Sequence, residues 1–312
     1  MPTIEINHVS KRYPNGTLAL DDILLDIQAG EIVGVLGPNG AGKTTLIKLM
    51  IGLIFPTQGK IRIMGMDMLQ AEMSIKTRSG VVHQNDAFDD ILSVGDNLLI
   101  HGAFYGLTGK QVRERSASLL DAFGLASKWK SPLQHLSGGE CRKLQIVRAL
   151  LNQPTVLFLD EPSTSLDVQA KRTFHEMMRQ QAQERGITIV WTTHDLAEIE
   201  NVCNRVAVLK TGRLIALELP AMLGRLVGGD LVTITLATGT EQLRLCEQLR
   251  QEGYQADALD KSKLTLRLHN AEEELMPLVS QWLQAGYAVR AVLVKHTSLE
   301  DAYLYLTEGR TT

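Results

Sequence analysis

The amino-acid sequence predicts an α/β protein with a parallel central sheet, an antiparallel β subdomain, a helical subdomain and a small C-terminal α/β domain. Three observations predict this fold class. Apolar residues 32–36 precede a glycine-rich loop and a helical pattern. Apolar residues 156–159 are followed directly by two acids. Strand and helix patterns alternate after residue 228. Short apolar strands of this kind are typical of parallel sheets covered on both faces.

Residues 37–45 read GPNGAGKTT, which is a phosphate-binding pattern between a buried strand and a helix. Glycines at this loop let successive N–H groups turn toward phosphates, and the N-terminus of the helix adds its dipole. Lys43 supplies a positive charge to the β and γ phosphates, and the hydroxyl of Thr44 can bind Mg²⁺. We therefore predict a nucleotide site formed by Gly37, Pro38, Asn39, Gly40, Ala41, Gly42, Lys43, Thr44 and Thr45.

Two acids, Asp160 and Glu161, directly follow apolar residues 156–159. A strand buried on both faces ends at the ligand edge of a parallel sheet. We expect Asp160 to reach the Mg²⁺ and Glu161 to act as general base for the attack of water on the γ phosphate. Two solvated acids at a strand end are the alternative, and the phosphate loop upstream makes that interpretation the weaker one.

Residues 136–140 read LSGGE and begin a helical pattern, so the serine and glycines lie at an anion-binding helix N-terminus. This segment resembles LSGGQ, the signature motif of the ATP-binding-cassette (ABC) family. The resemblance implies a phosphate-loop (RecA-like) ATPase core, ATP and Mg²⁺ as cofactors, and a helical subdomain at about residues 90–152. It also implies a homodimer in which Ser137, Gly138 and Gly139 cap the γ phosphate held by the opposite protomer. An ordinary serine N-cap followed by glycines is the alternative.

Three further positions match the family residue by residue. Gln84 matches a glutamine that touches metal or water in a loop facing the membrane partner, and His194 matches the switch histidine at the γ phosphate. Asp167 matches the loop that crosses to the other protomer. Tyr13 lies where an aromatic ring commonly stacks on adenine, with packing or solvation as the alternative. The expected catalytic residues are Glu161, His194 and Gln84, and the expected metal ligands are Thr44, Gln84 and Asp160.

The sequence departs from the family pattern at two places. Glu140 stands where glutamine is usual, close to a predicted phosphate that would repel it, although the helix dipole tolerates an acid there. We therefore expect Glu140 to turn away from the nucleotide. Residues 163–165 read Ser-Thr-Ser where many relatives have a glycine, and because Asp167 stays in place we expect little consequence.

Residues 1–217 carry every motif, and residues 3–8 and 19–27 within them read as antiparallel edge strands. Pro220 and the glycine pair at 228–229 mark a boundary. Residues 218–312 then alternate three strand patterns with three helical ones, which predicts a small accessory domain without a catalytic constellation. The ending HTSLEDAYLYLTEG resembles that of ATPases serving the ABC-2 class of exporters, of the drug-resistance type. A helix capped by Ser298 is the alternative interpretation.

Composition excludes several classes of function. A formal charge of -3 gives no nucleic-acid footprint, and no stretch approaches the ~20 apolar residues of a membrane span. The three cysteines lie far apart, which indicates a reducing cytosol and no metal cluster. We expect a soluble, cytoplasmic chain held at the inner face of the cell membrane by a separate integral permease.

The leading hypothesis is therefore an ATPase subunit whose ATP-dependent dimer closure drives export through an ABC-2 permease. One alternative is a soluble ABC ATPase acting as a mechanical switch on ribosomes or DNA. Such proteins usually carry tandem cassettes or a long coiled coil, and this chain has one motif set and no heptad run. A small-molecule kinase is a third possibility, but it has no use for LSGGE.

Overall fold

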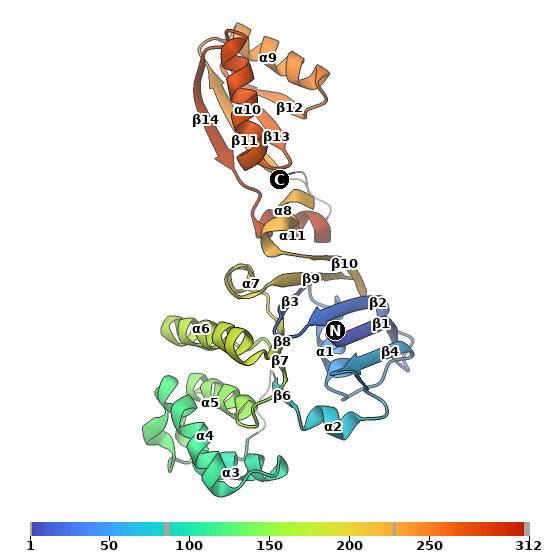
Figure 1. Ribbon diagram of the computed structural model, residues 1–312, viewed down its shortest axis with the longest axis vertical. Coiled ribbons are helices and arrows are strands. Elements are labelled where there is room, and N and C mark those ends of the chain that lie inside the picture. The colour runs from blue at the N-terminus through green and yellow to red at the C-terminus, as the bar shows by residue number, and fades with distance from the viewer. Residues whose placement is uncertain (1, 84–87, 227–228, 309–312) are drawn as a thin grey trace. The chain divides into compact units, whose positions relative to one another are not determined.

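The computed structural model describes residues 2–83, 88–226 and 229–308, and it divides into two compact units, residues 1–217 and 218–312 (Figure 1). In its described residues, no helix combines the length and the apolar character that crossing a membrane requires. Each unit has its own hydrophobic core.

The first unit is built on a six-stranded sheet in the order β10-β9-β3-β8-β7-β6. Every pairing among β6, β7, β8, β3 and β9 is parallel, so the carboxyl ends of these strands lie at one edge. The phosphate loop follows β3 and the two acids end or follow β7, and register therefore brings them to the same edge. The strands are β3 (Ile32–Leu36), β6 (Ser79–Val82), β7 (Val156–Asp160), β8 (Thr188–Thr192), β9 (Arg205–Lys210) and β10 (Arg213–Glu218).

A second, antiparallel sheet of this unit has the order β2-β1-β4-β5. Its strands are β1 (Pro2–Arg12), β2 (Leu18–Gln28), β4 (Gln58–Ile63) and β5 (Met66–Asp67). The antiparallel pairing of β1 and β2 was expected, but β1 is not an edge strand, because β4 pairs with its other side.

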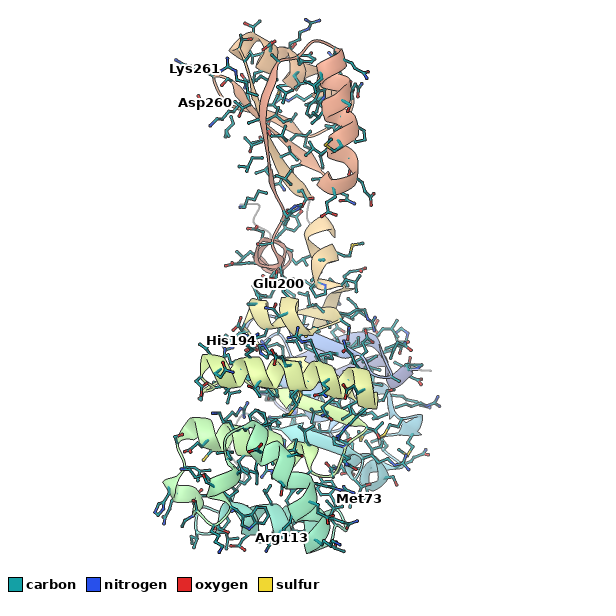
Figure 2. The ribbon with its side chains drawn as sticks, turned by 60° about the vertical axis from the view of Figure 1, so that its left-hand side comes forward. Met73, Arg113, His194, Glu200, Asp260 and Lys261 are labelled. Carbon is teal, nitrogen blue, oxygen red and sulfur yellow. The ribbon has the colours of Figure 1, made fainter. Side chains whose placement is uncertain are left out.

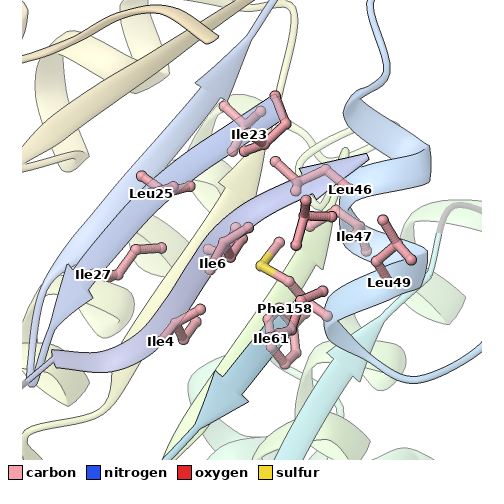
Figure 3. Packing of buried hydrophobic residues seen from close by; sticks show 14 of the residues in the cluster. Ile4, Ile6, Ile23, Leu25, Ile27, Leu46, Ile47, Leu49, Ile61 and Phe158 are labelled. Carbon is pink, nitrogen blue, oxygen red and sulfur yellow. The ribbon is translucent and has the colours of Figure 1, made fainter. Parts of the chain in front are cut away.

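A hydrophobic core lies between the two sheets and the helix α1 (Lys43–Met50), as Figure 3 shows. Isoleucines of β1 and β2 meet Leu46, Ile47 and Leu49 of α1 and Phe158 of β7, all of them buried. Burial of each such side chain contributes about 1.5–3 kcal/mol. This packing fixes the N-terminus of α1, and with it the phosphate loop, against the central sheet.

Helices make up the rest of the first unit. The helical pattern expected near residues 90–152 is divided into α3, α4 and α5 by turns, among them Gly106 with φ 72° and the capping box of Thr108. The helix α6 packs on the central sheet, where the rings of Phe174 and Trp191 have centroids 5.0 Å apart. The helices are α2 (Glu72–Lys76), α3 (Val94–Phe104), α4 (Gly109–Ala122), η1 (Ala126–Lys128), η2 (Leu133–His135), α5 (Gly138–Leu150), α6 (Val168–Arg185) and α7 (Leu196–Val202).

The second unit contains a βαββαβ arrangement with the sheet order β12-β13-β11-β14, which is the ferredoxin-like topology. Its core is formed by apolar residues of the sheet and of α9 and α10, with Trp282 fully buried. The elements are α8 (Pro220–Leu226), β11 (Asp230–Leu236), α9 (Gly239–Gln251), β12 (Ala256–Asp260), β13 (Lys263–Leu268), α10 (Ala271–Gln284), β14 (Val289–Lys295) and α11 (Leu299–Glu308). The sequence prediction missed β12, an edge strand of which only Ala256 is buried.

Candidate nucleotide site

The glycines of the phosphate loop are required by the backbone at two positions. Gly37 has φ 159°, and a Cβ there would lie 2.5 Å from the carbonyl oxygen of Leu209. Gly42 has φ 107°, and a Cβ there would lie 2.6 Å from the side chain of Leu20. Gly42 is also the N-cap of α1, and no side chain caps the helix at that end. The first N–H groups of α1 are therefore available to an anion.

A cavity of about 320 Å³ lies at this edge of the central sheet. It brings together most of the predicted loop and both predicted acids. Its walls are Thr17, Leu18, Ala19, Asn39, Gly40, Ala41, Gly42, Lys43, Thr44, Thr45, Asp160 and Glu161. Gly37 and Pro38 take part through their carbonyl oxygens, which accept hydrogen bonds from Lys43 Nζ at 2.6 and 3.2 Å.

Lys43 is the cation of this cavity. Burial lowers its pKa from the ordinary value, while the carboxylates of Glu161 and Asp160 act in the opposite direction. The ammonium group is thus held between loop carbonyls and two acids. A polyphosphate that entered the cavity would meet a lysine already oriented by the loop.

The two acids are held in different ways. Asp160 is the last residue of β7, and its Oδ1 accepts a hydrogen bond of 2.6 Å from the hydroxyl of Thr192 on β8. Glu161 has a left-handed backbone with φ 52°, and its N–H donates to the carbonyl oxygen of Thr192 at 3.0 Å. A non-glycine residue in this conformation is strained, and such strain clusters at functional sites.

His194 lies in the loop between β8 and α7 and is labelled in Figure 2. Its Nδ1 is 2.6 Å from Oε2 of Glu161. The carboxylate of Glu161 is 17% exposed and the imidazole is 78% exposed, so the pair reaches from the cavity to solvent. The structure thus brings together two of the three predicted catalytic residues.

Arg142 of α5 holds the backbone on which the two acids stand. This guanidinium is buried, and it donates to the carbonyl oxygens of His83, Asp160, Glu161 and Pro162, at 2.8 Å for Pro162 and 2.9 Å for Asp160. The sequence analysis missed Arg142. The available signal was an arginine on the same buried helical face as Ile146 and Ala149.

The signature segment forms the N-terminus of α5, where Ser137 is the N-cap of a capping box. Among the described residues that line the cavity, Ser137, Gly138 and Gly139 do not appear. A Cβ on Gly139 would lie 3.0 Å from the carbonyl oxygen of Ser165, so the segment packs closely on the loop after β7. Within one chain, the signature residues and the phosphate loop are therefore separate.

Two other predicted residues, Tyr13 and Asp167, are described by the structure but are not among the described residues that line the cavity. The hydroxyl of Tyr13 is 3.4 Å from that of Thr45, beside the start of α1. Asp167 caps α6 by accepting from the N–H of Ala170 at 2.8 Å, and it pairs with Lys143 at 3.3 Å. Gln84 lies outside the described residues. Ligand contacts for all three remain predictions.

The helix α7 carries a buried acid, Glu198, that the sequence analysis did not single out. Glu198 is 2% exposed, accepts from the hydroxyl of Thr193 at 2.9 Å and pairs with Lys171 at 3.3 Å. Burial raises the pKa of Glu198, but the neighbouring polar groups of His175 (Nε2 at 3.8 Å), Ser163 and Thr193 and the charge of Lys171 outweigh burial and lower it to about 2. Its signal in the sequence was the position on the inner face of α7 with Ile199 and Val202.

The parallel sheet, the loop and the two acids define the class of protein, which is a phosphate-loop nucleotide-binding protein. The model of the family "ABC transporter" matches residues 20–164, and that of "AAA domain, putative AbiEii toxin, Type IV TA system" matches the overlapping residues 129–200. The chain belongs to the ABC transporter family, in which it is an ATP-binding subunit and an ATPase.

Similar proteins cover nearly the whole chain. It is 36% identical over 305 residues to Nod factor export ATP-binding protein I of Burkholderia pseudomallei (strain 1710b), over 97% of this chain and 96% of the relative. It is 31% identical over 304 residues to daunorubicin resistance ATP-binding protein DrrA3 of Streptomyces coeruleorubidus, over 97% of this chain and 95% of the relative.

Solved structures of ABC ATPases share the fold. One is the ATP binding subunit of an ABC transporter, with a TM-score of 0.68 and 30% identity over 72% of this chain and 93% of that chain. Another is dimeric MJ0796, a bacterial ABC transporter cassette, with a TM-score of 0.65 and 27% identity over 69% of this chain and 98% of that chain. The predicted fold class and family are thereby confirmed.

Proposed function

We propose that this chain hydrolyses ATP to drive export through a separate integral membrane permease of the ABC-2 type. The observation that carries the proposal is one cavity shared by Lys43, Asp160 and Glu161, with the signature serine Ser137 outside it. The relatives are named for Nod factor export and daunorubicin resistance, which favours export over a switch on ribosomes or DNA.

The residues of the cavity suit a magnesium nucleotide. Hydroxyl, carboxylate and amide oxygens are ligands that Mg²⁺ prefers, and it usually binds one or two carboxylates together with substrate phosphates. Thr44 and Asp160 supply such oxygens at the cavity, and Gln84 is the third proposed ligand. The bound ion would neutralise charge on the β and γ phosphates.

The loop amides and Lys43 would bind the phosphates of ATP, with the ring of Tyr13 against adenine. Glu161 would accept a proton from the attacking water, whose oxygen bonds to the γ phosphorus while the bond to the β–γ bridging oxygen breaks. The products are ADP and phosphate. His194 would orient Glu161 and contact the γ phosphate.

A second copy of the chain would complete each site. Ser137, Gly138 and Gly139 lie at an N-terminus that can bind a phosphate, and the cavity of their own chain does not include them. We propose that they cap the γ phosphate of the partner and that the loop of Asp167 crosses the same two-fold interface. The similar cassette MJ0796 is described as dimeric, including bound to ADP and phosphate.

The membrane partner would contact the loop that contains Gln84, and closure of the dimer would reach the permease there. In this arrangement the chain would be a peripheral subunit on the cytoplasmic face of the membrane.

The substitution Glu161→Gln tests the hydrolytic part of the proposal. Removing a general base is expected to lower turnover by about 10²–10⁴-fold while ATP still binds, so that an ATP-bound dimer accumulates. Phosphate release and sedimentation with Mg-ATP measure both effects. The matched control is Glu176→Gln on the exposed side of α6, which should leave both unchanged. Normal turnover in the Glu161 variant would remove the catalytic role.

A further inference from the structure

The signature motif of this chain carries an acid whose position the structure defines. The carboxylate of Glu140 folds back on the N-cap, where Oε2 accepts from the N–H of Ser137 at 2.9 Å and from its hydroxyl at 3.2 Å. The other oxygen, Oε1, lies 3.1 Å from Nζ of Lys128. Glu140 therefore contacts the serine that should bind the phosphate of a partner.

This contact has an electrostatic consequence for the proposed dimer. Ser137 cannot approach a γ phosphate without bringing the Glu140 carboxylate close to the same phosphate. Both groups are negatively charged, and in an interface that excludes bulk water two like charges this close repel strongly. Hydrogen bonds from the Ser137 backbone and from Lys128 lower the pKa of Glu140, so the carboxylate is ionised at neutral pH.

Lys128 is held where it can offset this charge. It is the last residue of η1, its N–H donates to the carbonyl oxygen of Leu125 at 2.9 Å, and its own carbonyl oxygen accepts from Ser131 at 2.8 Å. The next residue, Trp129, accepts from the N–H of Gly95 on α3 at 2.8 Å. The Lys128 side chain is 35% exposed and that of Glu140 is 26% exposed, so the pair is only partly screened by water.

We propose that Lys128 is a positioning residue for the ATP-bound dimer, because it neutralises the Glu140 carboxylate and lets Ser137 approach the γ phosphate bound by a second copy. The inference rests on the proposed function of Ser137. Lys128 and Glu140 would then act as a unit. Loss of the lysine alone exposes a negative charge to the phosphate, whereas loss of both charges removes the repulsion together with its compensation.

The test uses the full chain with Glu161→Gln, in which ATP is turned over slowly, and measures the dissociation constant of the Mg-ATP dimer by sedimentation. Lys128→Gln is expected to weaken the dimer about tenfold, and Lys128→Arg to restore it to within about threefold. In a Glu140→Gln background, Lys128→Gln should change the constant by less than about twofold. Raising the salt concentration should bring the dissociation constant of the Lys128→Gln variant closer to that of the parent, because salt screens the repulsion between Glu140 and the phosphate.

Lys130→Gln is the matched control, since this exposed lysine lies two residues away and forms no ion pair with an acid among the described residues. It should leave the dimer unchanged. A purely structural role for Lys128 would lower the melting temperature and weaken the dimer equally in both backgrounds, and that result would overturn the proposal. An equal effect of Lys130→Gln would do the same, because it would indicate a general charge effect.

Ser137→Ala distinguishes a failure of the proposed phosphate capping by Ser137 from a failure of the role of Lys128. If it leaves the ATP-dependent dimer intact, or if the parent forms no such dimer, the proposed capping by Ser137 fails, and the role of Lys128 fails with it. If Ser137→Ala abolishes the dimer while Lys128→Gln has no effect, only the role of Lys128 is removed.

Discussion

Replacing Arg142 with methionine would remove the guanidinium that joins α5 to the backbone of the two acids. Methionine retains an unbranched apolar stem of similar length, so packing changes little and the lost hydrogen bonds dominate. The carbonyl oxygens of His83, Asp160, Glu161 and Pro162 would lose the bond from this guanidinium, although the N–H of Thr164 still donates to Glu161 at 3.3 Å. The substitution therefore removes the support of the site without replacing a predicted ligand-binding residue.

The expected loss in the free energy of unfolding follows from the number of hydrogen bonds that Arg142 makes. A buried polar group left unsatisfied costs about 1–3 kcal/mol, but carbonyl oxygens near the cavity can recover water. We therefore expect Arg142→Met to lower the free energy of unfolding of residues 1–217 by about 3–5 kcal/mol. Displacement of Asp160 and Glu161 should also lower kcat by at least about tenfold, with a smaller change in KM.

Denaturant unfolding followed by fluorescence measures the first effect, and phosphate release measures the second. A Trp282→Phe background restricts the signal to Trp129 and Trp191, which both belong to residues 1–217. The control is Arg115→Met, because Arg115 donates to the carbonyl oxygen of Leu151 at 3.3 Å. That variant should lose about 1 kcal/mol or less. If the free energy of unfolding of Arg142→Met lies within about 1 kcal/mol of that of the parent and kcat is unchanged, Arg142 does not support the site in this way.

Two further predictions concern stability. Ser165 has φ 70°, a conformation that favours glycine, so Ser165→Gly should stabilise the chain by about 0.5–1 kcal/mol and Ser165→Val should destabilise it by about 1–2 kcal/mol in the same unfolding assay. Equal free energies of unfolding for the parent and both variants would show that the backbone of Ser165 is not strained. The pKa of Glu198 is lowered from 4.5 to about 2, so its stabilisation is present above pH 4.5 and is lost as the pH falls toward 2. Glu198→Gln should cost up to about 3 kcal/mol at pH 7, and its deficit relative to the parent should shrink in acid. A deficit that does not vary with pH would refute this assignment.

The parts of the site that the sequence predicted are those set by local patterns. A glycine loop between an apolar strand and a helix, and acids at the end of a buried strand, constrain the backbone within a few residues. Parallel pairing then brings the loop after β3 and the acids after β7 to one edge, where the cavity confirms that Lys43 and Glu161 lie together.

The parts that the sequence did not predict depend on contacts between distant segments. The reach of Arg142 to four carbonyl oxygens and the pairing of Lys128 with Glu140 depend on how η1, α5 and the loop after β7 pack. The sequence analysis noted that residues 163–165 lack the glycine of many relatives, but it did not predict the left-handed backbone of Ser165. The strand β12 lacked the apolar alternation of an inner strand because it lies at the edge of its sheet.

In the sheet of the second unit, the register between β11 and β14 has a practical consequence for engineering. The chain begins β11 at Asp230 and ends β14 at Lys295, and Leu231 lies directly opposite Lys295. The two ends of the βαββαβ segment are thus neighbours. A short peptide could bridge them after excision, and a foreign module with adjoining termini could be spliced into the same position, so chimaeras with related ATPases need no long connecting segment.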